Sequence, residues 1–330
     1  MTDASDRTGN VGNAAALDDA VRLLRSGGLV VFPTETVYGL GADALNPDAV
    51  AKVYELKQRP ANNPLIVHVA DTASARSLVA SWPSAAELLA ERFWPGPLTM
   101  VLDRAAHVPH AVSAGGPTIA VRCPDHPLTL ELLRRIGRPL VGPSANASGT
   151  VSPTTAEHVR AWLGDRVPVL DGGPCARGIE STVVRLGAGP AAVLRPGVIT
   201  PREIGAVVAV DDSEQDDAGP GEGPVPSPGM LRRHYSPRTP VRLFEPSQRR
   251  AVLDRLEGGA SVVVLSPGMA VEHERLVRMP ADPEGYAREL YAALHRADGI
   301  KAEAILIELP QGESQVWNAI RDRLRRAASG

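Results

Sequence analysis

The stretch LVVFPTETVYGLG, residues 29–41, decides the fold of the first half of the chain. Its first three residues are apolar and predict a buried strand, which ends at Pro33. Two threonines, one glutamate and one tyrosine follow directly, and then Gly39 and Gly41 let the backbone pass close to a ligand or another strand. Polar side chains this dense beside a buried strand are typical of the floor of a binding site.

Length and composition predict two globular domains. The chain has 330 residues, of which 43% are apolar, and so exceeds the usual range of one domain. The net charge of −3 argues against a protein whose whole surface binds nucleic acid, but it is compatible with a local basic cleft.

Cysteine content and hydropathy indicate an intracellular setting. Cys123 and Cys175 are too few for a disulfide framework or a zinc set. The polar N-terminal stretch MTDASDRTGN lacks the apolar segment of a signal peptide, and no apolar run approaches the ~20 residues of a membrane span. We therefore expect a cytoplasmic protein that does not cross a membrane.

Strands and helices interleave along the chain, which predicts an α/β class. Asn46 before Pro47 marks a helix start, and three capping boxes mark others: Ser84 to Glu87, Thr154 to Glu157 and Thr200 to Glu203. Strands are expected at 65–69, 98–102, 118–122, 139–142, 167–170, 181–186 and 192–195. The last two follow each other without a helix, so we expect a mixed sheet.

The domain limits follow from changes in composition. Residues 1–13 are small and polar and are expected to be disordered, and 14–207 form the first domain. Residues 208–240 form a linker that is acidic and rich in Gly and Pro, except for the basic, aromatic segment 227–237. Residues 241–330 repeat the strand–helix alternation and predict a small Rossmann-like domain.

Charged and polar side chains gather where the strands of the first domain end. Lys57 and Arg59 precede Asn62 and Asn63 in a proline-bounded loop, which favours an anion site, although Lys57 could also be a cation that caps a helix. Arg122 ends a strand, where it pairs with a structural carboxylate or grips a ligand carboxylate. Arg195 ends another strand, so a small polyanionic ligand is expected.

The loop 142–149, with the sequence GPSANASG, carries hydroxyls and an amide after a further strand. It imitates a nucleophile elbow, but Asn146 stands where that motif needs glycine, and no serine-hydrolase triad accompanies it. The loop fits contacts to phosphates or a ribose, whereas a turn with helix capping remains plausible for Ser148 and Ser152.

Three other signals carry less weight. Gly39 and Gly41 imitate a dinucleotide fingerprint, but the next helix starts only near Asn46, and no Walker-type phosphate loop is present. His107 and His110 lack a nearby third metal ligand. The basic helix at 317–326 is interpreted as a solvated face.

Several motifs occur together in one order and spacing, and they resemble the YrdC-like family of threonylcarbamoyl-AMP synthases. They are FPTETVYGLG (32–41), Lys57-x-Arg59-Pro60, PLIVHV (64–69), TIAVRCP (118–124), PSANASG (143–149), IESTVV (179–184) and LRPG (194–197). The segment SPGMLRRHYSP (227–237) and the C-terminal α/β unit resemble the long, two-domain form. That form often has Lys-Tyr where this chain has Leu231 and Arg232.

The resemblance implies a reaction of L-threonine, bicarbonate and ATP that gives threonylcarbamoyl-AMP and pyrophosphate, for a tRNA adenosine beside the anticodon. It implies a YrdC-like twisted mixed sheet with flanking helices, and Mg²⁺ that arrives with ATP. It also implies a downstream tRNA threonylcarbamoyl-transferase as the consumer of the product, with tRNA contacted only weakly or indirectly.

Site residues are carried over motif by motif. The threonine contacts implied are Thr36, His68, Arg122, Gly142 and Ser181, with Arg122 on the carboxylate. The ATP contacts implied are Arg59, Asn63, Thr118, Ser144, Asn146, Ser152, Arg195 and Tyr235. Lys57, Arg59 and Arg195 are the expected catalytic cations, with Lys57 and Asn146 on the phosphates. Because Tyr235 lies in the linker, segment 227–237 is expected to fold over the nucleotide as a lid.

Two other functions are compatible with parts of the sequence. A binding module for double-stranded RNA or tRNA would use the basic cleft and bind in a salt-dependent way, but the net acidity opposes it. A carbamoyl-adenylate transferase would be expected to carry further zinc-binding or phosphate-hydrolysing segments, which this sequence lacks.

Overall fold

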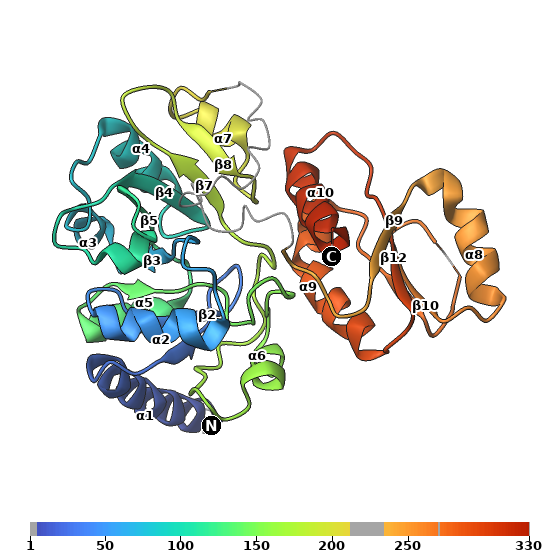
Figure 1. Cartoon of the computed structure of the whole chain (residues 1–330), viewed down its shortest axis with the longest axis horizontal. Coiled ribbons are helices and arrows are strands. Elements are labelled where there is room, and N and C mark those ends of the chain that lie inside the picture. Colours follow the sequence, from blue (N-terminus) through green and yellow to red (C-terminus); the bar gives the residue numbers. More distant parts are fainter. Residues whose placement is uncertain (1–4, 212–233, 270, 330) are drawn as a thin grey trace.

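The computed structural model describes residues 5–211, 234–269 and 271–329. Figure 1 shows two units side by side, an N-terminal unit with a large sheet and a C-terminal unit with a smaller one. Most of segment 227–237, expected to be a lid, lies outside the described residues, and only His234 to Pro237 can be placed.

The N-terminal unit is built on an eight-stranded mixed sheet, which confirms the expected fold class. Its strand order is β1-β2-β6-β3-β5-β4-β7-β8. The β3/β5 and β4/β7 pairs are parallel and the other neighbours are antiparallel. The strands are β1 (Val30–Phe32), β2 (Gly39–Asp43), β3 (Ile66–His68), β4 (Leu98–Asp103), β5 (Thr118–Arg122), β6 (Leu140–Val141), β7 (Thr182–Arg185) and β8 (Ala192–Arg195).

One face of this sheet carries the main core. Val67, Met100 and Val121 point into it and pack with Val50 of α2 and Leu89 of α4. The helices of the unit are α1 (Ser5–Arg25), α2 (Pro47–Lys57), α3 (Thr72–Arg76), α4 (Ser84–Phe93), α5 (Pro127–Ile136), α6 (Ala156–Leu163) and α7 (Pro201–Gly205), with a 3₁₀ turn at His110–Ser113.

The opposite face carries only a small apolar cluster of Ile66, Val101, Ala120, Val183 and Leu194. Side chains alternate between the two faces of a strand, so His68 and Arg122 share this second face with Ile66 and Ala120. This second face of the sheet is therefore packed by few apolar side chains and leaves room for a binding site.

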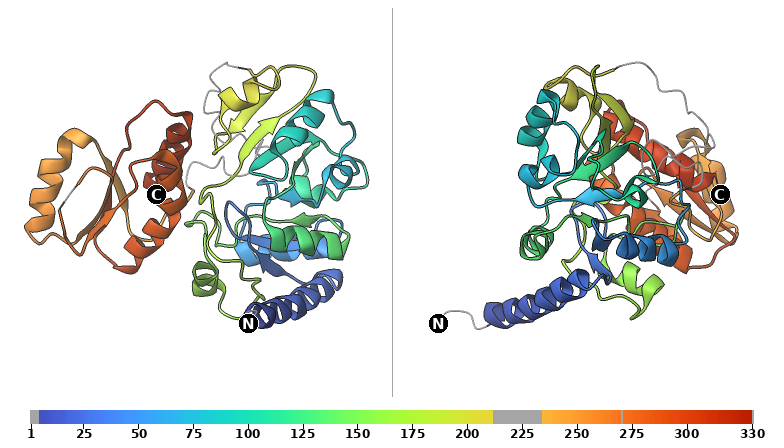
Figure 2. Two further views of the ribbon diagram at one scale, coloured as in Figure 1. Left: turned by 180° about the vertical axis from the view of Figure 1, so that it is seen from behind. Right: turned by 60° about the vertical axis from the view of Figure 1, so that its left-hand side comes forward.

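The N-terminus differs from the sequence prediction. Helix α1 begins at Ser5, so the stretch 5–13 is helical rather than disordered. A helix that is already nucleated extends at low cost, because each added residue gains a backbone hydrogen bond. In Figure 2 the N-terminal end of α1 projects from the rest of the molecule.

The C-terminal unit is a four-stranded parallel sheet in the order β11-β10-β12-β9, which fits the predicted small α/β domain. Helix α8 packs on one face of this sheet, and α9 and α10 pack on the other. The elements are β9 (Val241–Phe244), a 3₁₀ turn (Pro246–Gln248), α8 (Arg249–Glu257), β10 (Val262–Ser266), β11 (Leu276–Arg278), α9 (Pro283–Gly299), β12 (Ala304–Glu308) and α10 (Gln315–Ala328).

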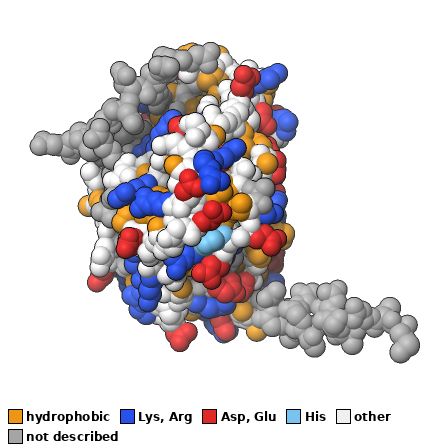
Figure 3. Space-filling model, turned by 90° about the vertical axis from the view of Figure 1, so that its right-hand side faces the viewer, with side chains coloured by type: hydrophobic (Ala, Val, Ile, Leu, Met, Phe, Trp, Pro, Cys, Tyr) orange, Lys and Arg blue, Asp and Glu red, His pale blue; other side chains and the backbone are white. Residues whose placement is uncertain are grey.

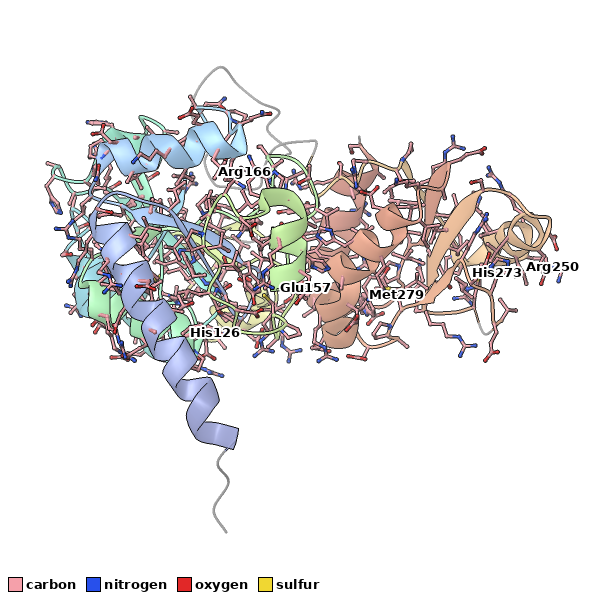
Figure 4. The ribbon with its side chains drawn as sticks, turned by 90° about the horizontal axis from the view of Figure 1, so that it is seen from below. His126, Glu157, Arg166, Arg250, His273 and Met279 are labelled. Carbon is pink, nitrogen blue, oxygen red and sulfur yellow. The ribbon has the colours of Figure 1, made fainter. Side chains whose placement is uncertain are left out.

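Helices α9 and α10 face the N-terminal unit, whereas α8 lies on the far side (Figure 1). Figure 4 shows α6, marked by Glu157, beside the C-terminal unit, with Arg250 and His273 at the distant end of that unit. The imidazole rings of His158 on α6 and His295 on α9 stack with centroids 4.0 Å apart. No helix among the described residues is long and apolar enough to cross a membrane.

Gly178 is a tight contact point between the units. Its φ is +73°, in the left-handed region that favours glycine, and a Cβ there would lie 2.4 Å from Cα of Arg288 on α9. We expect Gly178→Ala to strain the loop and to push α9 away, and so to weaken the docking of the two units. Hydrogen exchange of α9 should then speed up, and the midpoint of denaturant unfolding should fall.

Gly173→Ala is the matched control for this substitution. Gly173 has a φ of +77°, but a Cβ there would meet nothing within 4 Å. Gly173→Ala therefore measures the cost of backbone strain alone, about 1–3 kcal/mol, without a clash with α9. Equal destabilisation by the two variants, with α9 exchange unchanged, would contradict the assigned role of Gly178.

Candidate active site

A cavity lies over the second face of the large sheet. His68, Arg122 and Arg195 are the last residues of β3, β5 and β8, and Ser181 directly precedes β7. Because β7 runs antiparallel to β5 and β8, the start of β7 and the ends of β3, β5 and β8 lie at the same end of the strands. The lining residues are Thr34, Thr36, Val37, Gly39, Arg59, Ile66, His68, Arg122, Gly142, Pro143, Ser144, Glu180, Ser181, Arg195, His234 and Tyr235.

Arg122 is buried at one end of the cavity and is held on three sides. Its Nη2 donates to Glu35 Oε1 at 2.6 Å, its Nη1 donates to Thr36 Oγ1 at 2.9 Å, and its Nε donates to the Gly96 carbonyl at 3.2 Å. Glu35 also accepts the backbone N–H of Asp125. The structural carboxylate considered for Arg122 therefore exists and is Glu35. An arginine has five N–H donors, so among the described residues two remain for a ligand.

His68 lies beside this arginine as a neutral imidazole. Burial, followed by the charge of Arg122, lowers the pKa of His68 to about 3. Its ring contacts Phe32 edge-on at 5.4 Å, and a Cβ at Gly142 would lie 2.6 Å from its Nδ1. Gly142 is thus needed because a side chain there would displace the imidazole.

Arg59 is the cation of the loop that follows α2. Its guanidinium donates to the Asn63 carbonyl, to Asn63 Oδ1 at 2.6 Å and to the Pro64 carbonyl. Burial lowers the pKa of Arg59 to about 10; the positive charge of Arg195 adds to this, whereas Tyr54 opposes it. Asn63 does not line the cavity itself, but it orients the arginine that does.

Ser181 and Arg195 form the next part of the wall. The Ser181 hydroxyl lies 2.8 Å from Thr99 Oγ1, and Arg195 donates to both the carbonyl and the hydroxyl of Ser181. Burial lowers the pKa of Arg195. The Ser181 hydroxyl and the Arg195 guanidinium are therefore fixed relative to each other at this end of the strands.

Lys57 lies behind the cavity rather than on it. Its Nζ donates to the carbonyls of Ser144 and Asn146, and it lies 5.9 Å from the ring centroid of Trp162. Burial lowers the pKa of Lys57 well below its usual value, and Arg59 adds to this effect. These contacts fix the loop that presents Ser144, so Lys57 acts on the cavity through that loop.

Three further predicted ATP contacts also lie off the cavity wall. Asn146 closes its own loop through bonds to the carbonyls of Ala147 and Thr150, and Ser152 donates to Glu180 Oε1 at 2.7 Å. Thr118 begins the strand that Arg122 ends and shares its face, so it lies about 13 Å further along the sheet.

His234 and Tyr235 enter the cavity from the chain that precedes the C-terminal unit. Tyr235 has a φ of +62°, a left-handed conformation that is strained for a bulky residue. Its ring stacks on Tyr291 of α9 with centroids 5.6 Å apart, and Arg323 of α10 lies over it at 5.6 Å. The cavity is thus completed by two linker residues, and α9 and α10 of the C-terminal unit hold Tyr235 in place.

Four buried polar atoms around the cavity have no hydrogen-bond partner among the described residues. They are Asn63 Nδ2, His68 Nδ1, His234 Nδ1 and Tyr235 OH. Most buried polar groups in proteins are paired, so such a cluster points to a polar ligand that supplies the missing partners.

Sequence reasoning missed three residues of the cavity region: Glu35, Glu180 and His234. All three stand inside motifs that were recognised, and their signal was a charged or titratable side chain next to a predicted contact. Among the described residues, no group of three or more His, Cys, Asp or Glu side chains could hold a metal ion.

The buried imidazoles predict how stability changes with pH. Burial lowers the pKa of both His68 and His234 to about 3, from 6.5. The unfolded chain binds these protons near pH 6.5, whereas the folded chain stays neutral until much lower pH. The free energy of unfolding should therefore fall as the pH falls below about 6.5, by about 1.4 kcal/mol per pH unit for each imidazole.

His68→Gln tests this dependence, because it removes the protonation step of His68 and leaves that of His234. Denaturant unfolding across the range from about pH 7 to pH 4 should show a shallower loss of stability in the variant. An identical slope in both proteins would contradict the neutral state assigned to His68.

The fold and the cavity define a class: a two-domain α/β protein with a cationic, hydroxyl-lined site for a small anionic ligand. The family model described as "Telomere recombination" (Sua5, YciO and YrdC) matches residues 22–197, and the model described as "Threonylcarbamoyl-AMP synthase, C-terminal domain" matches residues 199–329. This chain belongs to the Sua5–YciO–YrdC family, in its two-domain form.

Curated relatives and solved structures agree with this assignment. A threonylcarbamoyl-AMP synthase of Bacillus subtilis is 41% identical over 329 residues, which cover 96% of this chain and 94% of that protein. The enzyme of the same name from Pyrococcus abyssi is 39% identical over 317 residues, covering 94% and 93%. The crystal structure of P. abyssi Sua5 complexed with L-threonine has a TM-score of 0.86, with 37% identity and 94% of both chains covered.

A second P. abyssi Sua5 structure also has a TM-score of 0.86, at 36% identity, and covers 94% of this chain and 92% of that chain. In that protein a histidine and the tyrosine after it were both replaced by alanine.

Proposed function

We propose that this chain is a threonylcarbamoyl-AMP synthase. It converts L-threonine, bicarbonate and ATP into threonylcarbamoyl-AMP, pyrophosphate and water, for the threonylcarbamoyl modification of a tRNA adenosine. The observation that carries this proposal is one cavity that holds a buried arginine beside hydroxyls at one end and two further arginines, Arg59 and Arg195, along its wall.

Threonine fits the end of the cavity at Arg122. The two remaining N–H groups of Arg122 would grip the amino-acid carboxylate, with Thr36 beside it. The neutral ring of His68 and the fixed hydroxyl of Ser181 are the polar groups that would meet the amine and the hydroxyl. The absence of a side chain at Gly142 leaves space for that ring.

ATP fits beside the threonine, along the face of the sheet that carries Arg122. Arg59, Ser144 and Arg195 line the adjacent wall and would hold the phosphates. The apolar cluster of Ile66, Ala120 and Leu194 gives a flat floor for the rest of the nucleotide. Thr118 lies further along that face, within reach of an extended ATP molecule.

The arrangement suits an attack of one anion on another. Bicarbonate loses water to give CO₂, and the threonine amine adds to this CO₂ with loss of a proton to give a carbamate. A carbamate oxygen then attacks the α-phosphorus of ATP while pyrophosphate leaves. Two anions must approach, so fixed cations and orientation supply the catalysis. Arg59 and Arg195 are placed to do this, and Lys57 contributes by holding the Ser144 loop.

Mg²⁺ enters this scheme with ATP. A bound Mg²⁺ keeps several waters and is commonly held by nucleotide phosphates with few protein ligands. Its contribution would be to neutralise the leaving pyrophosphate.

His234 and Tyr235 are proposed to close over the nucleotide. Both have an unpaired buried polar atom among the described residues, and Tyr235 is anchored on Tyr291. Hydrogen exchange at these residues should slow when ATP and threonine are both present, because closure excludes water from the adenylate. Equal exchange with and without substrates would contradict closure.

The adenylate must pass to a protein that transfers its threonylcarbamoyl group to tRNA, with this chain contacting tRNA weakly or indirectly. The end of the C-terminal unit seen in Figure 3 supports this, because acidic and basic side chains are interspersed on that face. An RNA-binding face would instead carry clustered positive charge.

Pyrophosphate release tests the proposed function. The full chain should release pyrophosphate from MgATP only when threonine and bicarbonate are both supplied, and serine should support a lower rate. Release that does not depend on threonine would overturn the proposal.

A further inference from the structure

A buried charge cluster joins the C-terminal unit to the cavity. At its centre lies Glu180, which lines the cavity and is 8% exposed. Ser152 donates to its Oε1 at 2.7 Å, Tyr291 of α9 donates to its Oε2 at 2.8 Å, and Arg323 of α10 approaches Oε2 at 3.4 Å. Both carboxylate oxygens are therefore engaged, and two of the three partners come from the C-terminal unit.

Arg323 is tied to both units. It is 1% exposed, and its Nη1 donates to the carbonyl of Pro196, which directly follows Arg195 in the chain. It also pairs with Asp322 at 3.2 Å and lies over the ring of Tyr235. A buried guanidinium with this set of contacts cannot be removed without leaving the Glu180 carboxylate buried and undercompensated.

Glu180 interacts electrostatically with two arginines, Arg323 and Arg195. Arg195 belongs to the wall that would hold the phosphates, whereas Arg323 belongs to the C-terminal unit. Burial alone would raise the pKa of Glu180, but Arg323 and then Arg195 hold it below its usual value. The carboxylate is therefore charged, next to the place where a polyanion must bind.

We propose that Arg323 and Tyr291 are positioning residues for the synthase reaction: they hold the Glu180 carboxylate so that it does not compete with the phosphates of ATP for Arg195. The inference rests on the proposed function, since it takes ATP as the ligand. It gives the C-terminal unit a defined part in building the nucleotide site of the other unit.

The first test measures binding of a non-hydrolysable ATP analogue, AMP-PNP with Mg²⁺, to the full chain by calorimetry. Arg323→Met should weaken analogue binding about 10- to 100-fold, in the range of a lost charge-assisted contact. The double variant Arg323→Met with Glu180→Gln should recover most of that loss, because the competing charge is gone. A defect that Glu180→Gln does not relieve would overturn the proposal.

Measuring analogue binding across a pH range separates the positioning role of Arg323 from a purely structural one. The titratable groups near Glu180 are Arg195 on β8, Arg323 on α10, Tyr291 on α9, and His234 and Tyr235 before β9, and Asp322 pairs with Arg323. Without Arg323, burial raises the pKa of Glu180, so protonation at lower pH should remove the competing charge. The binding defect of Arg323→Met should shrink as the pH is lowered from about 8 to about 6, and a constant defect would contradict the proposal.

Arg249→Met is the matched control. Arg249 forms an ion pair with buried Glu308 inside the C-terminal unit, on α8 at the far side of that unit (Figure 1). Arg249→Met removes a comparable ion pair that does not contact the cavity, so analogue binding should stay within about twofold of wild type. A loss equal to that of Arg323→Met would mean that any weakening of the C-terminal unit has this effect, and would overturn the proposal.

Tyr291→Phe keeps the test open if Arg323→Met does not fold. It removes one hydrogen bond to Glu180 and keeps the ring that stacks on Tyr235. Analogue binding should weaken about 3- to 10-fold and recover with Glu180→Gln. Failure of the proposed function would look different: wild type would bind the analogue but release no threonine-dependent pyrophosphate.

Discussion

Replacing Arg122 with methionine is expected to raise the threonine concentration for half-maximal rate by at least about 100-fold, with the ATP requirement changed far less. Hydrogen bonds to charged groups are each worth about 1.5–3 kcal/mol, and Arg122 offers two remaining donors to the carboxylate. Steady-state pyrophosphate release at varied threonine and at varied ATP measures both requirements.

This variant also leaves Glu35 buried without its cation, which is expected to cost about 3–5 kcal/mol of stability. The double variant Arg122→Met with Glu35→Gln reduces that cost and should keep the threonine defect. Arg185→Met, an exposed arginine on β7, is the control and should behave as wild type. A threonine requirement that returns to normal in the double variant would contradict the placement of the carboxylate.

Replacing Arg195 with methionine is expected to lower kcat by a factor on the order of 10²–10³. Loss of one preorganised group aimed at developing charge has effects of this size. Threonine affinity without ATP should change less than about tenfold, because Arg195 acts on that end of the cavity indirectly, through its bonds to Ser181. Rapid-quench measurement of pyrophosphate at saturating substrates gives kcat, and calorimetry gives the affinity.

Arg202→Met is the control for this substitution, since Arg202 is exposed on α7 just beyond the same strand. Its kcat should be that of wild type. If Arg195→Met instead raised only the ATP requirement and left kcat unchanged, Arg195 would bind the nucleotide without acting in the transfer step.

Much of the fold could be predicted from local sequence signals. Asn46 caps α2 with Pro47 at its first turn, and the Thr200 to Glu203 capping box is present as expected. Two helix starts differ from the prediction: α4 has Pro83 at its N-cap and no side-chain cap from Ser84, and α6 is capped by Thr155 rather than Thr154. Neighbouring residues of similar chemistry compete for one cap, and tertiary packing decides between them.

Tertiary pairing explains the other differences. The strand expected at 167–170 makes only a single bridge, between Val169 and Val31, because Pro168 has no N–H for a ladder. Strand β11, at Leu276–Arg278, is three residues long and half-buried, so it gave no clear pattern. Its pairing with β10 depends on the parallel sheet already being present.

The sequence motifs identified the residues of the site, but not which of them line the cavity and which lie behind it. All five expected threonine contacts line the cavity, whereas Lys57, Asn63, Asn146 and Ser152 lie behind it. A motif does not show which of its side chains faces a ligand and which holds the one that does. Likewise, no local signal links Arg323 to Glu180, which lie 143 residues apart in sequence.

The most direct test of this account is mass analysis of the product formed from ¹³C-bicarbonate, L-threonine and MgATP. The account predicts an adenylate that contains threonine and carries the ¹³C label, with one pyrophosphate released for each. An unlabelled threonine adenylate, or ATP cleavage without threonine, would contradict it.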